Sequence, residues 1–451
     1  MGRLFGTDGI RGRANQYPMN AETALLVGRA AAMVLGAAAG AGAGAALIGQ
    51  DTRLSGDMLA QAVAAGILSA GMPAVRVGVL PTPAVAYLAA ITHAPLGIVI
   101  SASHNPFEDN GIKIFDTRGL KIDDLQQSLI EERIFAKQER RPDRESQPAS
   151  MSAPERAPRE AYRDFLVTAG GKFGRLDGLH VVLDCANGAA SGLAAPVFSA
   201  LGAQVTTLAD NPDGRNINAA CGSEHPAALC RAVVASGARA GLAFDGDADR
   251  VVAVDESGAV LSGDQVIAIL AQDLDRRQRL RPRCVVTTVM SNLGLGLALR
   301  RMGIALHTSD VGDRRVVEVM GRTGAVLGGE DSGHIILRDV HTTGDGMLAG
   351  LRLMSVLAGG GAPLSSLARV MTRYPQVLRS VPVKTKPPIE SLEAVTAQIQ
   401  AAQQTLQEQG RVLVRYSGTQ ALCRVMVEGP SREAIEVMCS RIADALRGAI
   451  G

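Results

Sequence analysis

Short apolar runs with the pattern of buried strands alternate with helical patterns along most of the chain. This alternation is typical of α/β layers whose strands are largely parallel. The expected strands are Val181–Leu183, Gly241–Phe244, Val251–Val254, Val285–Val289 and Ile335–Leu337. The expected helices lie near Ala21–Leu35, Gln265–Arg276 and Arg315–Met320. The pattern therefore predicts an α/β protein.

The chain has 451 residues, which is more than one hydrophobic core usually serves, so several domains are expected. A charged, proline-dotted region from Lys137 to Arg159 marks one boundary, and further breaks fall near Asp255–Gly258 and after Leu367–Tyr374. We expect three similar α/β domains with mixed, largely parallel sheets, followed by a smaller α+β domain. Their expected bounds are 1–150, 151–255, 256–370 and 371–451.

Composition excludes several classes of partner. The formal net charge is only +2, and no run of Lys and Arg is interleaved with aromatic residues, so nucleic acid is not an expected partner. The uncharged segment Ala30–Gln50 is long enough to span a bilayer, but it is mostly Ala and Gly and would gain little from lipid. A short helix, a loop and a strand from near Ala46 are expected instead, and no membrane partner is expected.

Cysteine usage indicates the compartment. The six cysteines are scattered and form no Cys-x-x-Cys pair, so we expect buried thiols in a reducing environment. The N-terminus lacks a signal-peptide pattern. We therefore expect a cytoplasmic protein, and a monomer and a homodimer are both compatible with the sequence.

The stretch Gly97–Pro106 is the first candidate for chemistry. Its apolar run Ile98–Ile100 predicts a buried strand, which ends in two serines, a histidine and an Asn-Pro turn. A buried strand that delivers hydroxyls to a sharp loop suits an exposed nucleophile. A polar turn at the end of a strand is the alternative.

An acidic cluster, Asp245, Asp247 and Asp249, is the second candidate. In an extended backbone alternate side chains project to one side, and three adjacent carboxylates repel one another unless a cation neutralises them. Hard oxygen ligands suit Mg²⁺, and the neighbouring Arg250 can hold phosphate oxygens. A solvated acidic turn and a phosphatase whose Asp245 accepts the phosphoryl group are alternatives. A calcium loop of the EF-hand type fails, because Arg250 occupies the position that requires Gly.

Three further loops combine glycine with polar side chains. Phe5–Gly12 offers Arg11 as a phosphate ligand, and a later loop offers Glu330 and Ser332 as ligands for sugar hydroxyls. Arg415–Thr419 follows a strand and provides a guanidinium, hydroxyls and backbone N–H groups at a Gly turn, which is a common phosphate-binding arrangement. Plain surface turns are the alternative for the first two loops.

Taken together, these segments resemble the α-D-phosphohexomutase superfamily, and within it the bacterial members that act on glucosamine phosphates. The resemblance covers nearly the whole chain. The motifs that carry it, in the family's order, are Phe5–Gly12, Asp51–Gly56, Pro81–Pro83, Gly97–Phe115, Asp245–Arg250, Val311–Arg314, Gly329–His334, Thr342–Gly346 and Arg415–Thr419.

The resemblance implies four domains around a central cleft, with one Mg²⁺ per chain bound by a phosphoserine at Ser103 and by Asp245, Asp247 and Asp249. The residues that it places at the reacting centre are Ser103, Lys113, Arg11, Arg250 and His334. Those that it assigns to the sugar hydroxyls are Glu330 and Ser332. Those that it assigns to the distal phosphate are Arg415, Ser417, Gly418 and Thr419.

The implied activity is that of an isomerase. A hexosamine phosphate, glucosamine 6-phosphate, would be converted to glucosamine 1-phosphate through a 1,6-bisphosphate, which supplies UDP-N-acetylglucosamine for peptidoglycan precursors. The alternative within the superfamily is a phosphoglucomutase or phosphomannomutase. A magnesium phosphatase and a non-catalytic sugar-phosphate sensor are alternatives from other classes.

Three positions depart from the family pattern. Gln50 stands where Lys is usual, Gln420 where Glu is usual, and Asp331 where the members that act on glucosamine have Gln. The first two positions bear on phosphate affinity, and Asp331 bears on the choice of sugar.

Overall fold

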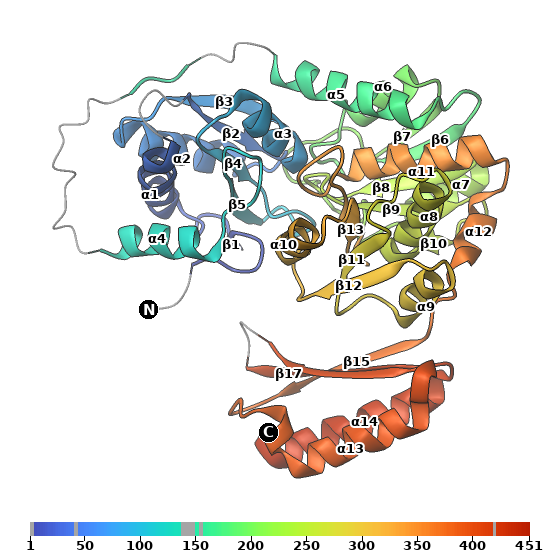
Figure 1. Ribbon diagram of the computed structural model, residues 1–451. Helices are drawn as coiled ribbons and strands as arrows, with labels where there is room; N and C mark the ends of the chain where they lie inside the picture. Colours follow the sequence, from blue (N-terminus) through green and yellow to red (C-terminus); the bar gives the residue numbers. More distant parts are fainter. Residues whose placement is uncertain (1–3, 40–43, 137–148, 153–156, 418–420) are drawn as a thin grey trace. The chain divides into compact units, whose positions relative to one another are not determined.

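The computed structural model of the chain describes residues 4–39, 44–136, 149–152, 157–417 and 421–451 (Figure 1). They form two compact units. The first contains Met1–Met290 and Ile304–Val370, and the second contains Ser291–Gly303 and Met371–Gly451. The first unit holds three α/β sheets and the second holds one antiparallel sheet.

The first sheet has the strand order β1-β5-β4-β2-β3. The central strands β2 and β4 are parallel and buried along their whole length, as expected for strands covered on both faces, whereas β5 and β1 continue the sheet in antiparallel fashion. The strands are β1 (Ile10–Arg13), β2 (Ala46–Gln50), β3 (Ala74–Val79), β4 (Gly97–Ile100) and β5 (Asp109–Phe115). The helices are α1 (Ala21–Ala39), α2 (Gly56–Ser69), α3 (Thr82–Thr92) and α4 (Asp124–Phe135).

Helices α1 and α2 cross at two glycines. A Cβ atom at Gly66 of α2 would lie 2.0 Å from the carbonyl oxygen of Leu25, and one at Gly28 of α1 would lie 2.3 Å from the carbonyl oxygen of Val63. Glycine weakens an isolated helix, so these residues cost helix propensity. They allow the two backbones to approach closely, and the helix pair contributes to the hydrophobic core of this domain.

The second sheet repeats the pairing pattern of the first. Its order is β10-β9-β8-β6-β7, with β6, β7 and β8 parallel and with β9 and β10 antiparallel. The strands are β6 (His180–Asp184), β7 (Gln204–Leu208), β8 (Ala240–Phe244), β9 (Val251–Asp255) and β10 (Val260–Leu261). The helices are α5 (Pro158–Phe173), α6 (Ala194–Ala200) and α7 (Ala227–Ser236).

The third sheet follows the same plan with four strands, in the order β12-β11-β13-β14, of which only β14 is antiparallel to its neighbour. Its first helix begins at a capping box, in which Ser262 and Gln265 each bind the other's backbone N–H. The strands are β11 (Cys284–Thr288), β12 (Ala305–Ser309), β13 (Leu327–Gly329) and β14 (Ile335–Leu337). The helices are α8 (Gly263–Arg276), α10 (Asp313–Thr323), α11 (Gly346–Gly360), α12 (Leu364–Leu367) and η1 (Ala368–Val370).

The second unit is an antiparallel sheet, β15-β17-β16, packed on two helices (Figure 1). Its elements are β15 (Gln376–Pro382), η2 (Ile389–Ser391), α13 (Glu393–Leu406), η3 (Gln407–Gln409), β16 (Arg411–Tyr416), β17 (Leu422–Glu428) and α14 (Arg432–Ile450). Helix α9 (Leu293–Arg301) lies between β11 and β12 in the sequence but belongs to this unit. The fully buried carboxylate of Glu428 accepts hydrogen bonds from the Asn292 side chain at 3.0 Å and from the Leu293 N–H at 3.3 Å.

The fold class is confirmed: three similar α/β domains with mixed sheets and a smaller α+β domain. The predicted strands and helices are all present, and β2 begins at Ala46 as expected. The predicted domain bounds and the central cleft stay predictions. Within the described ranges no single helix is long and apolar enough to cross a membrane, while one bent pair, Gly346–Gly360 with Leu364–Val370, passes a test of length and composition only. All six cysteines are free, and five are buried, with Cys230 half-buried.

Candidate active site

The serine loop, residues 101–108, connects β4 to β5. Ser103 lies in it with a positive φ of 56° and is completely buried, so the expectation of an exposed nucleophile is wrong for this structure. The reason is that the β8–β9 turn covers the loop. Ser103 Oγ donates a hydrogen bond of 2.5 Å to Asp245 Oδ2, which joins two residues 142 positions apart in the sequence.

The three aspartates lie in the turn between β8 and β9. Their backbone is not extended as predicted, because Ala248 has a φ of 54° and the segment turns back on itself. The turn nevertheless brings the carboxylates of Asp245, Asp247 and Asp249 together, with one oxygen of each lying within 4.8 Å of the others. All three residues are buried. A turn, and not strand alternation, therefore builds the acidic cluster.

Lys113 on β5 is a buried cation that contacts the cluster. Its Nζ lies 2.7 Å from Asp247 Oδ2, 3.0 Å from Asp249 Oδ2 and 3.3 Å from Asp8 Oδ2. Burial favours the neutral amine, but the carboxylates outweigh it and raise the pKa of Lys113 well above 10.5. Burial, followed by the charges of Asp249 and Asp247, raises the pKa of Asp245 well above 3.8. Burial would also raise the pKa of Asp249, but Lys113, His334 and Arg250 outweigh it and lower that pKa well below 3.8, so the carboxylates of the cluster are not equivalent.

The carboxylate oxygens of the acidic cluster are suitable ligands for a hard divalent cation. Among the described residues, Asp247 Oδ1 and Asp249 Oδ1 are buried without any hydrogen-bond partner. A buried carboxylate oxygen without a partner is costly, so these two atoms are available for a ligand. Carboxylate and hydroxyl oxygens are suitable ligands for Mg²⁺. The second oxygen of Asp247 is held by the hydroxyl of Thr82 and by Lys113.

Arg11 and Asp8 extend the network of charges beyond Lys113. Arg11 donates to Asp8, and Asp8 also accepts from Lys121. Burial would raise the pKa of Asp8, but Lys113, Lys121 and Arg11 together lower it well below 3.8. Asp8 was not among the predicted site residues. Its position among the glycines of the opening loop was the only signal in the sequence.

Arg250 approaches the serine loop from the β8–β9 turn. Its Nη1 lies 3.0 Å from His104 Nδ1, which in turn lies 3.4 Å from Ser103 Oγ. Its Nε lies 3.8 Å from Asp249 Oδ1. Burial favours the neutral form of Arg250, but the charges of Asp249 and Asp245 outweigh it and raise the pKa of this guanidinium. The structure thus brings Arg250 to the predicted reacting centre together with Ser103, Lys113 and the three aspartates.

His334 lies just before β14. Its Nδ1 is 3.7 Å from Asp249 Oδ1, and its Nε2 accepts a hydrogen bond of 3.2 Å from the Gly344 N–H. The turn from β13 to β14 also carries Glu330 and Ser332. Glu330 accepts from the Gly312 N–H at 3.0 Å, whereas Ser332 is exposed. This turn therefore places a histidine next to the acidic cluster and carries a carboxylate and a hydroxyl close to it in the chain.

The predicted phosphate loop belongs to the second unit. Arg415 lies on β16, and Ser417 follows that strand and is buried. The Ser417 N–H donates to the Leu422 carbonyl oxygen at 2.8 Å, and Lys386 Nζ donates to the Ser417 carbonyl oxygen at 2.6 Å. Lys386 is a cation at this loop that sequence reasoning missed. Gly418, Thr419 and Gln420 lie outside the described residues.

Two of the departures from the family pattern have structural partners. The buried amide of Gln50 donates to Asp57 Oδ1 at 3.3 Å, and its Oε1 lies 3.5 Å from Arg76 Nη2. The carboxylate of Asp331 accepts a hydrogen bond from the Asp264 N–H at 3.2 Å. Both side chains thus take part in hydrogen bonding within the first unit.

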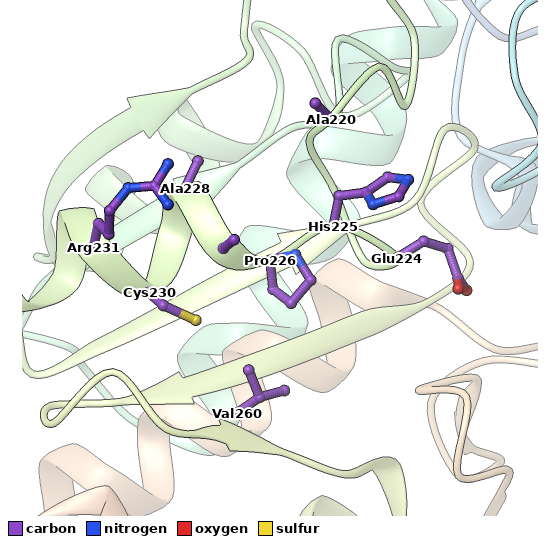
Figure 2. A pocket seen from close by; sticks show the side chains of 9 residues that line it. Ala220, Glu224, His225, Pro226, Ala228, Cys230, Arg231 and Val260 are labelled. Carbon is purple, nitrogen blue, oxygen red and sulfur yellow. The ribbon is translucent and has the colours of Figure 1, made fainter.

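A surface hollow lies beside α7 (Figure 2). It has a volume of about 700 Å³ and is lined by Ala220, Glu224, His225, Pro226, Ala227, Ala228, Cys230, Arg231 and Val260. None of the residues predicted for the site lines it. Glu224 connects it to the acidic turn, since its carboxylate lies 4.0 Å from Arg250 Nη1.

Four domain families match the chain in sequence. They are the phosphoglucomutase/phosphomannomutase α/β/α domains I, II and III, at residues 2–141, 160–258 and 262–374, and the C-terminal domain at 378–445. The four domain families, matched in order along the chain, together with the fold place the protein in the phosphoglucomutase/phosphomannomutase class.

Full-length relatives narrow the class. A phosphoglucosamine mutase of Syntrophus aciditrophicus is 48% identical over 452 residues, which cover 100% of both chains. Further curated relatives with 45–49% identity are also named phosphoglucosamine mutase. The chain belongs to the phosphoglucosamine mutase family.

Solved structures share the fold. The phosphoglucomutase/phosphomannomutase family protein of Burkholderia thailandensis matches with a TM-score of 0.83 and 26% identity, over 99% of this chain and 97% of that chain. An Aspergillus fumigatus N-acetylphosphoglucosamine mutase, solved with GlcNAc-6P and magnesium, matches with a TM-score of 0.71 and 18% identity, over 99% and 96%. At this lower identity the likeness concerns the fold alone.

Proposed function

We propose that the chain interconverts glucosamine 6-phosphate and glucosamine 1-phosphate, with Ser103 as the carrier of the phosphoryl group. The observation that carries the proposal is the hydrogen bond of 2.5 Å from Ser103 Oγ to Asp245, beside two buried carboxylate oxygens, on Asp247 and Asp249, that accept no hydrogen bond among the described residues. The names of the full-length relatives support the amino sugar as substrate. The reaction would supply glucosamine 1-phosphate for UDP-N-acetylglucosamine synthesis in the cytoplasm, by a monomer or a homodimer.

Carbon 1 and carbon 6 of a hexose are too far apart for a direct shift of the phosphoryl group. Ser103, once phosphorylated, therefore donates its phosphoryl group to O1 of glucosamine 6-phosphate: the bond from phosphorus to Oγ breaks, a bond to O1 forms, and O1 loses its proton. The 1,6-bisphosphate then turns end over end. Ser103 takes the phosphoryl group back from O6, and glucosamine 1-phosphate leaves.

Cationic side chains provide most of the transition-state stabilisation in this scheme, because phosphoryl transfer depends on positioning and on charge neutralisation. Arg11, Lys113 and Arg250 surround the serine and the acidic cluster. Lys113 and His334 are the two groups that we propose for movement of the hydroxyl proton; because the carboxylates hold Lys113 protonated, it would donate a proton to Ser103 Oγ, and His334 would accept the proton from the sugar hydroxyl. Glu330 and Ser332 would bind sugar hydroxyls, and the loop with Arg415, Ser417, Gly418 and Thr419 would bind the distal phosphate.

We further propose that Asp245, Asp247 and Asp249, together with the phosphorylated Ser103, hold one Mg²⁺. The closeness of the three buried carboxylates and the two oxygens that accept no hydrogen bond among the described residues support a cation at this position. The ion would neutralise charge on the transferring phosphoryl group. Without it, Lys113 is the cation that contacts Asp247 and Asp249.

Replacing Ser103 by alanine tests the proposal. The variant should lose mutase turnover, whereas Ser355→Ala, which removes another buried serine hydroxyl, should keep it. Mass spectrometry of the wild-type protein should find the phosphoryl group on Ser103. Turnover of the Ser103→Ala variant at the wild-type rate would refute the mechanism.

The choice of sugar needs a separate measurement. Turnover on the 6-phosphates of glucosamine, glucose and mannose should be highest for glucosamine. Faster turnover of glucose or mannose phosphate would assign the chain to the phosphoglucomutase or phosphomannomutase activity. Release of inorganic phosphate that does not need Ser103 would indicate a phosphatase, and binding without any turnover would indicate a sensor.

A further inference from the structure

We propose that Arg53 and Asn218 are positioning residues that clamp the backbone of the serine loop and fix Ser103 Oγ for phosphoryl transfer. This inference rests on the proposed role of Ser103 as the phosphoryl carrier. Neither residue is among those assigned to the reacting centre above. They come from different domains: Arg53 follows β2, and Asn218 lies in the connection between β7 and α7.

Arg53 uses all of its hydrogen-bonding capacity around this loop. Its side chain is completely buried, and its Nε binds Asp51 Oδ2 at 2.9 Å. Each Nη nitrogen binds two backbone carbonyl oxygens; the four acceptors are those of Ser103 at 3.0 Å, Asn105 at 2.8 Å, Asp109 at 3.0 Å and Pro106. A guanidinium has five N–H donors, so none is left over for another partner.

Asn218 holds two of the same oxygens from its own domain. Its Nδ2 lies 2.9 Å from the Ser103 carbonyl oxygen and 2.9 Å from that of Asn105. Each of these two carbonyl groups therefore accepts one bond from Arg53 and one from Asn218. The approach is close, because a Cβ atom at Gly246 in the acidic turn would lie 2.6 Å from the Ser103 oxygen and 2.9 Å from Asn218 Nδ2.

The N–H side of the nucleophile is fixed as well. The Ser103 N–H donates to Ser101 Oγ at 3.0 Å, and that hydroxyl donates to Asp51 Oδ2 at 2.6 Å. Asp51 thus links the two sides of the Ser103 backbone: it accepts from Ser101, which binds the Ser103 N–H, and from Arg53, which binds the Ser103 carbonyl oxygen. The backbone around Ser103 cannot rotate without breaking one of these bonds.

These hydrogen bonds hold Ser103 in an uncommon backbone conformation. A positive φ at a residue other than glycine is sparsely populated and persists where the surroundings over-determine it. Ser103 has a φ of 56°, and its side chain then points at Asp245. If the clamp were lost, the peptide could relax and move Oγ away from the acidic cluster, and a displacement of about 1 Å costs about 100-fold in rate.

Two substitutions test the clamp in the full-length protein. Arg53→Lys keeps the positive charge but replaces the planar fork by three donors on one atom. Asn218→Asp keeps the shape and turns the donor into an acceptor that faces two carbonyl oxygens. Both variants should lower kcat about 100-fold while KM for glucosamine 6-phosphate stays within about 2-fold, because the substrate ligands are elsewhere.

Matched controls separate positioning from general destabilisation. Arg352 is an equally buried arginine, paired with Asp273 and stacked 5.0 Å from the Phe173 ring, so Arg352→Lys should reduce stability and leave kcat within about 2-fold. Asn218 and Asn187 both have a positive φ, of 57° and 47°, and the Asn187 side chain also donates to a backbone carbonyl group, at 3.3 Å, so Asn187→Asp is the control for Asn218→Asp. The melting temperature is recorded for all four variants.

The transfer step itself gives a direct readout. Dephosphorylated protein is mixed with glucosamine 1,6-bisphosphate, and the rate at which Ser103 gains a phosphoryl group is followed by intact mass. The rate should fall with kcat in both clamp variants and not in the controls. If kcat and this rate stay within about 3-fold of the controls, the clamp is refuted while an inactive Ser103→Ala variant still supports the proposed function. If Arg53→Lys does not fold, Asn218→Asp decides; an active Ser103→Ala variant would instead overturn the proposed function.

Discussion

Replacing Asp345 by asparagine should make the first unit sensitive to mild acid, because it removes a group that offsets the buried His341. His341 is buried between two fixed partners: Nε2 lies 2.9 Å from the Pro83 carbonyl oxygen, and Nδ1 accepts from the Thr342 N–H at 2.7 Å. Both partners require a neutral ring with its proton on Nε2. Burial lowers the pKa of His341 to about 4.

The sign and size follow from proton linkage. Between pH 6.5 and about 4 the unfolded chain binds a proton at this residue and the folded chain does not, so stability falls as the pH falls through that window. The difference of about 2.5 between the two pKa values corresponds to about 3 kcal/mol, at 1.36 kcal/mol per unit. This loss is complete below the folded pKa.

Asp345 works in the opposite direction. It accepts a hydrogen bond from Tyr162 at 2.6 Å and caps α11, and burial raises its pKa from 3.8 to about 6. Between pH 6 and 3.8 the folded chain therefore binds more protons, and stability rises as the pH falls, also by about 3 kcal/mol. In the wild-type protein the two contributions nearly cancel.

Two variants separate them. Asp345→Asn should lose about 3 kcal/mol between pH 6.5 and 4 relative to wild type, and His341→Gln should gain a similar amount over nearly the same range. Urea unfolding at a series of pH values, followed by circular dichroism because the chain has no tryptophan, measures both. The comparison uses differences between variants, since a chain of several domains need not unfold in one step. If the two variants and the wild type share one pH dependence, the reasoning from burial is refuted.

Two further predictions concern the metal and the helix crossing. Chelation of divalent ions, and separately Asp247→Ala, should lower turnover at least about 100-fold, with Mg²⁺ restoring only the chelated wild type; a full rate after exhaustive chelation would remove the metal from the mechanism. Gly66→Ala should destabilise the protein by about 1–3 kcal/mol, because its Cβ would clash with the Leu25 carbonyl group, whereas Gly171→Ala, which meets nothing within 4 Å, should stabilise it by up to about 1 kcal/mol in thermal unfolding. Equal effects at the two glycines would contradict the close crossing.

Local pattern was sufficient for most of the fold. Apolar runs such as Val251–Val254 become strands because nearly all of their side chains are buried. The local pattern did not indicate which helices and strands pack against one another. That α9 joins the C-terminal elements, although it lies between β11 and β12 in sequence, depends on contacts of high sequence separation such as Asn292 with Glu428.

The candidate site also has features that the sequence indicated and features that it did not. Ser103 and the three aspartates stand out in the sequence because hydroxyls and carboxylates concentrated at the ends of buried strands are typical of catalytic and metal sites. The structure brings these side chains together, and their roles stay predictions. The turn geometry was missed, since a positive φ at Ala248 leaves no mark in composition. Arg53 and Asn218 were missed for a different reason: their partners are backbone carbonyl groups, which every sequence contains. That an arginine such as Arg53 is buried, and what it binds, becomes clear only from the folded structure.

Glu428 has a consequence for how the molecule can be dissected. The chain passes between the two units at residues 290–291, 303–304 and 370–371, so no single cut separates them. A fragment that starts at Met371 would deprive the fully buried Glu428 carboxylate of the Asn292 amide and the Leu293 N–H and leave it with Arg411 and Gln376. A fragment that ends at Val370 would carry α9 without the C-terminal elements that form one compact unit with it. Expression of the C-terminal piece alone is therefore expected to need α9 grafted onto it by a new linker.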